Sequence, residues 1–113
     1  AIVYLSDVSE ENGPFEYIEG SHRPLTIIAD LVRNDFSFNQ NRFTNDEIDA
    51  LLAHGNRRTE KITFAGKAGT LILVNTRGLH RGKPIEEGVR YALTNYVWSH
   101  MPIPAHIAKL AVQ

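Results

Sequence analysis

Five histidines and one arginine in a strand-like segment are the residues of this sequence best suited to chemistry. His80 follows the turn glycine Gly78 by two positions, and Arg90 comes ten positions after His80. Because side chains alternate along a strand, Arg90 should share a face with Ala92 and Thr94. A small residue and a hydroxyl beside an arginine leave room for a ligand carboxylate, which the planar guanidinium binds through two parallel hydrogen bonds. The plainer alternative, a solvated loop histidine and an arginine on the wet face of a strand, stays open on spacing alone.

Length and composition limit the kinds of protein this can be. With 113 residues, 42% hydrophobic and 22% charged, the sequence is typical of a single globular domain. A net charge of −1 argues against a nucleic-acid partner, and no polybasic or long apolar run indicates a membrane partner. The absence of cysteine excludes disulfides and thiolate metal sites. We therefore expect no nucleic-acid partner and no membrane partner; a cytoplasmic location is expected too, although the lack of cysteine says little about compartment. The oligomeric state is left open.

The elements that must position these residues are mostly strands. Apolar or alternating patterns predict strands in five segments, which are Ile2–Leu5, Phe15–Ile18, Lys61–Phe64, Thr70–Val74 and Val89–Trp98. Thr70–Val74 is apolar throughout, as in a strand buried on both faces, and Val89–Trp98 is the longest strand expected. Pro102 and Pro104 end that last strand. Short strands separated by glycine-rich turns indicate an all-β sandwich or jelly roll.

One helix is expected inside this β-rich chain. Thr44 and Glu47 have the spacing of a capping box, in which each side chain accepts a hydrogen bond from the other residue's backbone N–H. Apolar residues follow at helical spacing and Gly55 is suited to the carboxyl cap, so a helical insertion is predicted near residues 45–54. The tail, residues 105–112, is a candidate for a second, short helix.

Three stretches resemble a known family when they are taken together in their order and spacing. They are Tyr4–Phe15, with a strand and a Glu-Asn-Gly-Pro turn; Ile18–Arg23, with a Gly-Ser-His-Arg segment; and Ala68–Asn75 followed by Leu79–Gly82 and Arg90. In this combination the sequence is similar to the phytanoyl-CoA dioxygenase family of Fe(II)- and 2-oxoglutarate-dependent oxygenases. Residues 25–60 carry no part of the resemblance.

The resemblance implies a fold, two cofactors and a set of site residues. Members of that family carry a double-stranded β-helix, a cupin-like jelly roll, in which a His-x-Asp/Glu pair and a distal histidine hold Fe(II). The distal histidine corresponds to His80, a metal ligand, and the arginine that binds the far carboxylate of 2-oxoglutarate corresponds to Arg90. Thr94 is a further cosubstrate-binding candidate, and so is Tyr4, for which core packing is the competing interpretation. No residue is assigned a catalytic role of its own.

Two departures from the family pattern affect the metal site. No histidine in the sequence is followed, two positions later, by Asp or Glu, and Thr70 stands where the family has an aspartate. In the family the His-x-Asp pair precedes the segment that resembles residues 1–13, and Ala1–Leu5 reads as the middle of a buried strand. We therefore expect residues 1–113 to form a single, incomplete domain, the C-terminal part of a jelly-roll oxygenase, which does not bind iron tightly by itself.

The expected reaction is that of a 2-oxoglutarate-dependent dioxygenase, which hydroxylates a small organic substrate while 2-oxoglutarate is converted to succinate and carbon dioxide. Two alternatives stay open, a non-catalytic jelly-roll binding module and a metal-independent structural domain. The missing His-x-Asp pair favours the binding module if the sequence is complete. Of the other histidines, His22 is expected to support the turn at Gly20 and Ser21, and His54 to lie at a helix carboxyl end.

Overall fold

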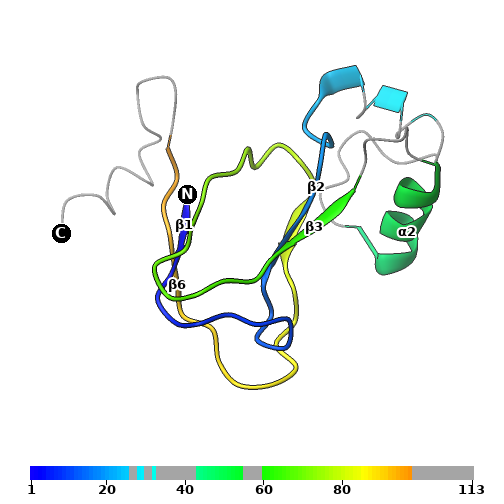
Figure 1. Cartoon of the computed structure of the whole chain (residues 1–113). Coiled ribbons are helices and arrows are strands. Elements are labelled where there is room, and N and C mark those ends of the chain that lie inside the picture. Colours follow the sequence, from blue (N-terminus) through cyan, green and yellow to red (C-terminus); the bar gives the residue numbers. More distant parts are fainter. Residues whose placement is uncertain (26–27, 30–31, 33–42, 55–59, 98–113) are drawn as a thin grey trace.

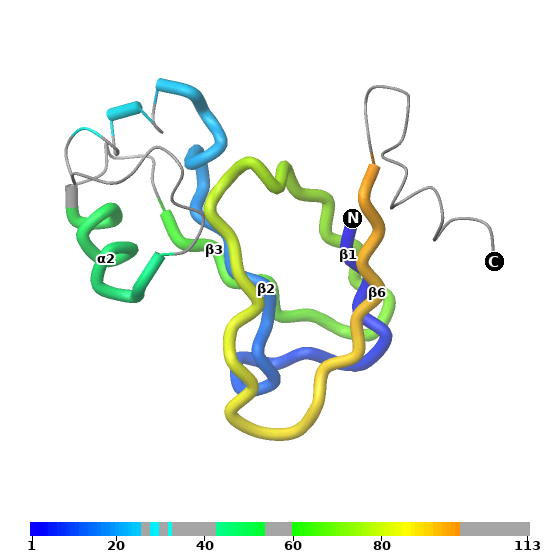
Figure 2. The backbone as a smooth tube through the Cα atoms, turned by 180° about the vertical axis from the view of Figure 1, so that it is seen from behind, coloured from blue at the N-terminus to red at the C-terminus, as the bar shows by residue number. Residues whose placement is uncertain are grey.

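The protein is built mainly from short antiparallel strands (Figures 1 and 2). The computed structural model describes residues 1–25, 28–29, 32, 43–54 and 60–97. In chain order the elements are β1 (Ile2–Tyr4), β2 (Phe15–Ile18), α2 (Asn45–His54), β3 (Lys61–Phe64), β4 (Leu71–Ile72), β5 (His80–Gly82) and β6 (Ala92–Thr94). Strands β1, β2 and β3 and helix α2 lie where the sequence predicted them, to within one residue at either end.

The first sheet has the strand order β4-β1-β6 and is antiparallel throughout. Ile2, in the central strand, lies opposite Ile72 on one side and Thr94 on the other. Tyr4, two positions further along β1, lies opposite Ala92. Because residues two apart on a strand share a face, these five side chains occupy one face of the sheet, which is its inner face.

The second sheet has the strand order β3-β2-β5 and is also antiparallel. Phe15, at the start of β2, lies opposite Phe64 on one side and Gly82 on the other. Tyr17 lies opposite His80. These positions form the inner face of the second sheet, which is turned toward the first. Helix α2 lies beyond the second sheet, on the side away from the first (Figure 1).

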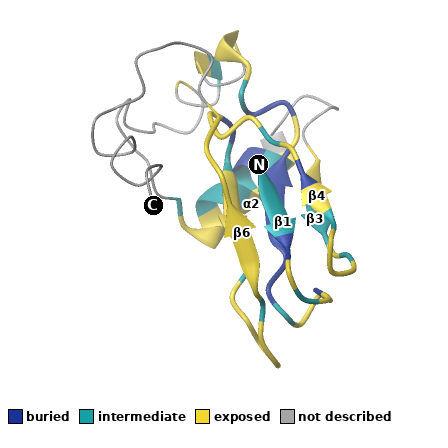
Figure 3. Cartoon of the chain, turned by 90° about the vertical axis from the view of Figure 1, so that its left-hand side faces the viewer, coloured by how far each residue is buried: buried dark blue, intermediate teal, exposed yellow. Residues whose placement is uncertain are grey.

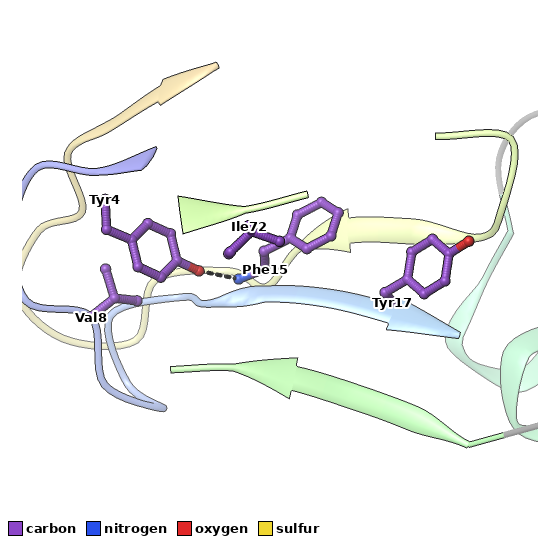
Figure 4. Packing of buried hydrophobic residues seen from close by; sticks show 5 residues of the cluster. All are labelled: Tyr4, Val8, Phe15, Tyr17 and Ile72. Atoms are coloured by element: carbon purple, nitrogen blue, oxygen red, sulfur yellow. Dashed lines mark hydrogen bonds between the residues drawn. The ribbon is translucent and has the colours of Figure 1, made fainter. Parts of the chain in front are cut away.

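The hydrophobic core lies between the two inner faces (Figure 4). Its buried members come from both sheets and from the loop after β1, and they are Tyr4, Val8, Phe15, Tyr17 and Ile72. The hydroxyl of Tyr4 ties the sheets together, because it donates to the carbonyl of Phe64 at 2.8 Å and accepts from the N–H of Phe15 at 2.9 Å. A tyrosine from one sheet thus satisfies two backbone groups of the other.

Helix α2 begins with the predicted capping box. The N–H of Thr44 donates to Glu47 Oε2 at 2.7 Å, and the N–H of Glu47 donates to Thr44 Oγ1 at 3.3 Å. These bonds satisfy N–H groups that a helix start otherwise leaves unpaired, so this prediction is confirmed. His54 is the last residue of the helix, also as predicted. None of the helices in the described part of the chain is both long and apolar enough to cross a bilayer.

Two predicted strands are shorter and less buried than expected (Figure 3). In β4, Ile72 is 3% exposed, whereas Leu71 is 57% exposed, so this strand is not buried on both faces. Its alternate side chains point to the core and to an outer face that stays exposed. Strand β6 is not the longest strand, and Arg90 precedes it instead of lying within it. Its only described partner, β1, is itself short, so the ladder ends early.

Strand β5 has no counterpart among the predicted strands. The sequence places His80 in a loop between two strands, whereas the structure makes it the first residue of β5, paired with β2. The tripeptide from His80 to Gly82 has little intrinsic strand preference, and its conformation comes from hydrogen bonds to a strand far away in the sequence. The prediction that residues 105–112 form a helix, and those about Trp98, Pro102 and Pro104, lie outside the described residues.

Two antiparallel sheets around a shared core agree with a mostly β chain. Helix α2 is the insertion that the sequence predicts in it. Closure of these sheets into a jelly roll stays a prediction.

Candidate functional site

A pocket of about 390 Å³ opens between the two sheets. Its walls include His80, Arg90, Thr94 and Tyr4, the four residues predicted from the sequence to bind metal or cosubstrate. Arg90, Ala92 and Thr94 line it together, as the alternation of side chains predicts. The fold thus brings these residues to one place, while the role of each of them stays a prediction.

The guanidinium of Arg90 is packed against the backbone of β5. A Cβ atom added at Gly82 would lie 2.9 Å from Arg90 Nη2 and 3.3 Å from Nη1, so a glycine keeps this space free. Arg90 Nη1 is buried and has no hydrogen-bond partner in the described part of the chain. A buried N–H of a charged group without an acceptor is costly, and a ligand oxygen at this point would relieve the cost. Arg90 and Gly82 therefore form a cradle suited to a carboxylate.

His80 has a fixed ring at the start of β5. Its Nδ1 lies 2.7 Å from the carbonyl oxygen of Gly78, and because a carbonyl only accepts, Nδ1 carries the proton. In the neutral ring, Nε2 then keeps a free lone pair. The ring also lies beside Phe15, with the two centroids 5.7 Å apart and an angle of 33° between the ring planes. A metal-binding histidine commonly has this arrangement, in which the second ring nitrogen donates to a carbonyl.

Tyr4 and Thr94 contribute differently to the pocket wall. Tyr4 is 1% exposed and its single hydroxyl hydrogen is used on Phe64, so its contacts favour the competing interpretation of core packing. Its ring still lines the pocket. Thr94 lies opposite Ile2 and is exposed, which leaves its hydroxyl accessible to a ligand in the pocket.

The described residues do not assemble a complete metal site. Among them, no three histidine, cysteine, aspartate or glutamate side chains lie close enough together to hold one ion. The role of His80 as one ligand of a facial triad stays a prediction.

Two residues that shape the site are absent from the sequence-based prediction. Gly82 forms the floor of the Arg90 cradle, and a glycine within a strand is a signal of close approach once the strand is recognised. Tyr17 donates its hydroxyl to the carbonyl of Asn75 at 3.1 Å, and the same hydroxyl lies 3.2 Å from Nδ1 of His22. The His22 ring thus contacts strand β2 through Tyr17. The residues next to His22 in the sequence do not indicate this contact.

A second hollow of about 800 Å³ lies between helix α2 and the second sheet, and His80 lines both hollows. On this side Glu16, which is 5% exposed, pairs with Arg81 at 2.5 Å and with Lys61 at 3.4 Å. Burial by itself would raise the pKa of the Glu16 carboxyl, but the hydrogen bond and charge of Arg81 and the charge of Lys61 outweigh it and hold the pKa below its ordinary value. This carboxylate therefore holds strands β2, β3 and β5 together and is not offered to a ligand.

A family model described as Phytanoyl-CoA dioxygenase (PhyH) matches residues 1–88. The matched part carries His80 and Gly82, and it ends two residues before Arg90. Proteins of this family generally depend on Fe(II) and 2-oxoglutarate. No curated protein and no solved structure matches the chain.

Proposed function

The chain belongs to the phytanoyl-CoA dioxygenase family, and from that premise we propose that it is part of an Fe(II)- and 2-oxoglutarate-dependent dioxygenase acting on a small organic substrate. Membership of the family supports dioxygenase-type chemistry. When bound, iron and 2-oxoglutarate would supply an oxidation by dioxygen, in which one oxygen atom enters succinate as 2-oxoglutarate loses carbon dioxide and the other oxygen atom enters one C–H bond of the substrate. The role of the protein is to bind and orient these reactants.

One observation carries this proposal: Arg90 Nη1 is buried beside Gly82 and has no hydrogen-bond partner among the described residues. In the proposed complex, the far carboxylate of 2-oxoglutarate accepts hydrogen bonds from Arg90, and the hydroxyl of Thr94 adds a further one. Gly82 and His80 lie two positions apart in β5 and face the same side, roughly 7 Å apart along the strand. A five-carbon dicarboxylate spans a comparable length, so its other end reaches the neighbourhood of His80. Tyr4 closes the pocket with its ring.

His80 supplies one metal ligand in this proposal, through Nε2, and the other ligands come from outside the described residues. Residues 1–113 are then the C-terminal part of one jelly-roll domain, whose remaining part completes the metal site. Two antiparallel sheets around a shared core, with a pocket between them, support this architecture.

Binding of 2-oxoglutarate to the purified chain, measured by isothermal titration calorimetry without metal, tests the role of Arg90. Arg90→Ala should weaken binding by about 10- to 100-fold, since a hydrogen bond to a charged group contributes about 1.5–3 kcal/mol. Arg77→Ala is the matched control, because it removes the same charge from a residue that lines only the hollow beside α2. Equal losses in the two variants would indicate general charge attraction and overturn the assignment.

Gly82→Ala tests the cradle without removing any charge. The added methyl would meet the end of the flexible Arg90 side chain, so the guanidinium shifts at little cost in stability. We expect about a tenfold loss of 2-oxoglutarate affinity, with less than about 1 kcal/mol change in the free energy of unfolding. A variant that binds as tightly as the parent chain would show that the carboxylate does not occupy the space above Gly82.

Anaerobic titration with Fe(II) and 2-oxoglutarate, followed by the visible charge-transfer band of the chelated pair, tests the oxygenase as a whole. Because the described residues bring together no set of three ligands, we expect no saturable band from residues 1–113 alone. A longer chain that adds a His-x-Asp pair should show the band and lose it in His80→Ala. Absence of the band from such a chain would contradict the proposal that the protein is an oxygenase.

A non-catalytic binding module is the second candidate, because no three metal-ligating side chains meet in the described part of the chain. Such a module keeps the Arg90 cradle and binds a carboxylate without iron. Fe(II) separates the two candidates, since it strengthens 2-oxoglutarate binding by an oxygenase with a complete site and leaves binding by the module unchanged. A purely structural domain binds no 2-oxoglutarate in either condition.

A further inference from the structure

We propose that Ser21 and Tyr17 are positioning residues for His80, and that they act through the backbone of the turn that precedes β5. The inference rests on the proposed function in one respect, the role of His80 as a metal ligand. Tyr17 belongs to β2, the strand next to β5, and Ser21 lies three positions beyond the end of β2. The neighbouring strand therefore holds the start of β5 from the side.

Ser21 holds Leu79, the residue directly before His80. The side chain of Ser21 is buried, and its Oγ accepts from the N–H of Leu79 at 2.8 Å and donates to the carbonyl of Ile18 at 2.6 Å. The N–H of Ile18 in turn donates to the carbonyl of Leu79 at 2.9 Å. The carbonyl of Leu79 is thus bonded to the last residue of β2 and its N–H to Ser21 just beyond, which fixes the peptide planes on either side of Leu79.

Tyr17 holds the other end of the same turn. Its hydroxyl donates to the carbonyl of Asn75, which also accepts from the N–H of Gly78 at 3.1 Å. A Cβ atom added at Gly78 would collide with the hydroxyl of Tyr17 and lie 2.8 Å from Ser21 Oγ, so Gly78 is packed directly against both side chains. Burial raises the pKa of the Tyr17 phenol, so the hydroxyl keeps its proton and remains a donor at neutral pH.

The carbonyl between these two anchors is that of Gly78, and it accepts from His80 Nδ1 at 2.7 Å. A carbonyl held in a fixed direction selects the Nδ1–H tautomer of neutral His80 and leaves the Nε2 lone pair for a metal. Free histidine in water favours the opposite tautomer. Ser21 and Tyr17 therefore determine which ring nitrogen of His80 is available, although neither is a ligand in the proposal.

The imidazole ¹⁵N chemical shifts of neutral His80, measured in the chain without metal or cosubstrate, report this tautomer directly. In the parent chain, neutral His80 should be mainly the Nδ1–H form, and a mainly Nε2–H ring would overturn the inference at once. In Ser21→Ala and in Tyr17→Phe, the tautomer ratio should shift toward that of free histidine. Ser9→Ala is the matched control, because the partners of the Ser9 hydroxyl among the described residues are Glu11 and Asn12, in an exposed turn.

Backbone amide spectra of each variant separate a loss of positioning from a loss of folding. If Ser21→Ala does not fold, Tyr17→Phe decides, since it keeps the buried ring and removes only the hydroxyl. A folded variant of either kind with an unchanged His80 tautomer would overturn the inference. Because neither metal nor 2-oxoglutarate is present, this result is independent of whether Arg90 binds the cosubstrate, so the two proposals fail separately.

Discussion

The two sheets share a core but differ in the contacts on their outer faces, and Figure 3 shows the outer face of the first sheet. Every residue of the central strand β2 is buried, whereas the central strand β1 of the first sheet is only partly buried; the edge strands β5 and β6 are both exposed. On the second sheet, Glu16 is enclosed by its ion pairs with Arg81 and Lys61. On the first sheet, Leu71 and Leu93 lie on an exposed outer face.

The difference indicates which sheet fixes each half of the site. His80 and the turn that orients it belong to the second sheet, where the exposed strand β5 is held to the buried strand β2 by backbone pairing and by the ion pair of Arg81 with Glu16. Thr94 lies in β6 of the first sheet, and Arg90 lies in the residues just before β6. The side chain of Arg90 extends to Gly82 in the second sheet. The metal-ligand half therefore depends on the second sheet alone, and the carboxylate cradle depends on how firmly the two sheets are joined.

The largest difference between the sheets should appear when one buried and one exposed side chain are removed. Phe15→Ala should lower the free energy of unfolding by about 3–5 kcal/mol, because it empties a buried core position of the second sheet. Leu93→Ala, on the outer face of the first sheet, should lower it by less than about 1 kcal/mol. Urea denaturation measures both changes. Similar losses would mean that the outer face of the first sheet is covered in solution.

The bond between the sheets is the next test. Tyr4→Phe should lower the free energy of unfolding by about 1–3 kcal/mol, because the carbonyl of Phe64 and the N–H of Phe15 lose a buried partner. Tyr91→Phe, in which the removed hydroxyl is on an exposed residue, is the matched control and should change stability little. Thermal unfolding of both variants gives the comparison. Equal stability of Tyr4→Phe and the parent chain would show that the sheets are joined by other contacts.

Acid should act on the second sheet through Glu16. Its pKa in the folded chain lies below the ordinary 4.5, so its contribution to stability is present above about pH 4.5 and is lost as the pH falls through the lower folded value. Glu16→Gln should cost about 1–2 kcal/mol at neutral pH, a modest value because Arg81 and Lys61 are half-exposed. Urea denaturation from pH 7 to pH 3 should show a flatter acid limb for the variant. If the free energy of unfolding of the variant falls with acid as steeply as that of the parent chain, Glu16 does not stabilise the second sheet.

The smallest effect is expected at the helix that lies beyond the second sheet. Thr44→Ala removes the acceptor at the start of α2 and should lower stability by about 0.5 kcal/mol. Circular dichroism during thermal unfolding measures it, with the His80 imidazole shifts as a second readout that should stay unchanged. A change at His80 would show that the bond between β5 and α2, in which Arg81 Nη1 donates to Asn45 Oδ1 at 2.7 Å, helps to orient His80 beside Ser21 and Tyr17.

Prediction from sequence succeeded where neighbouring residues carry the interaction. The capping box of Thr44 and Glu47 closes within four residues, so its pattern is sufficient to place α2. The alternation of Arg90, Ala92 and Thr94 likewise needs only local chain geometry, and all three line one pocket. Prediction was wrong about burial of Leu71, because the apolar character of a residue does not reveal whether another element packs on it.

The sequence by itself determined the chemical groups available, the helix, the first three strands and, through its motifs, the family. Tertiary structure alone decided that residues from His80 to Gly82 form a strand and that Gly82 lies under the guanidinium of Arg90. It also decided that the hydroxyl of Tyr4 forms its hydrogen bonds with the opposite sheet. The physical reason is the same in each case. These features depend on hydrogen bonds and close approaches between segments distant along the chain, and such partners exist only after the two sheets have come together.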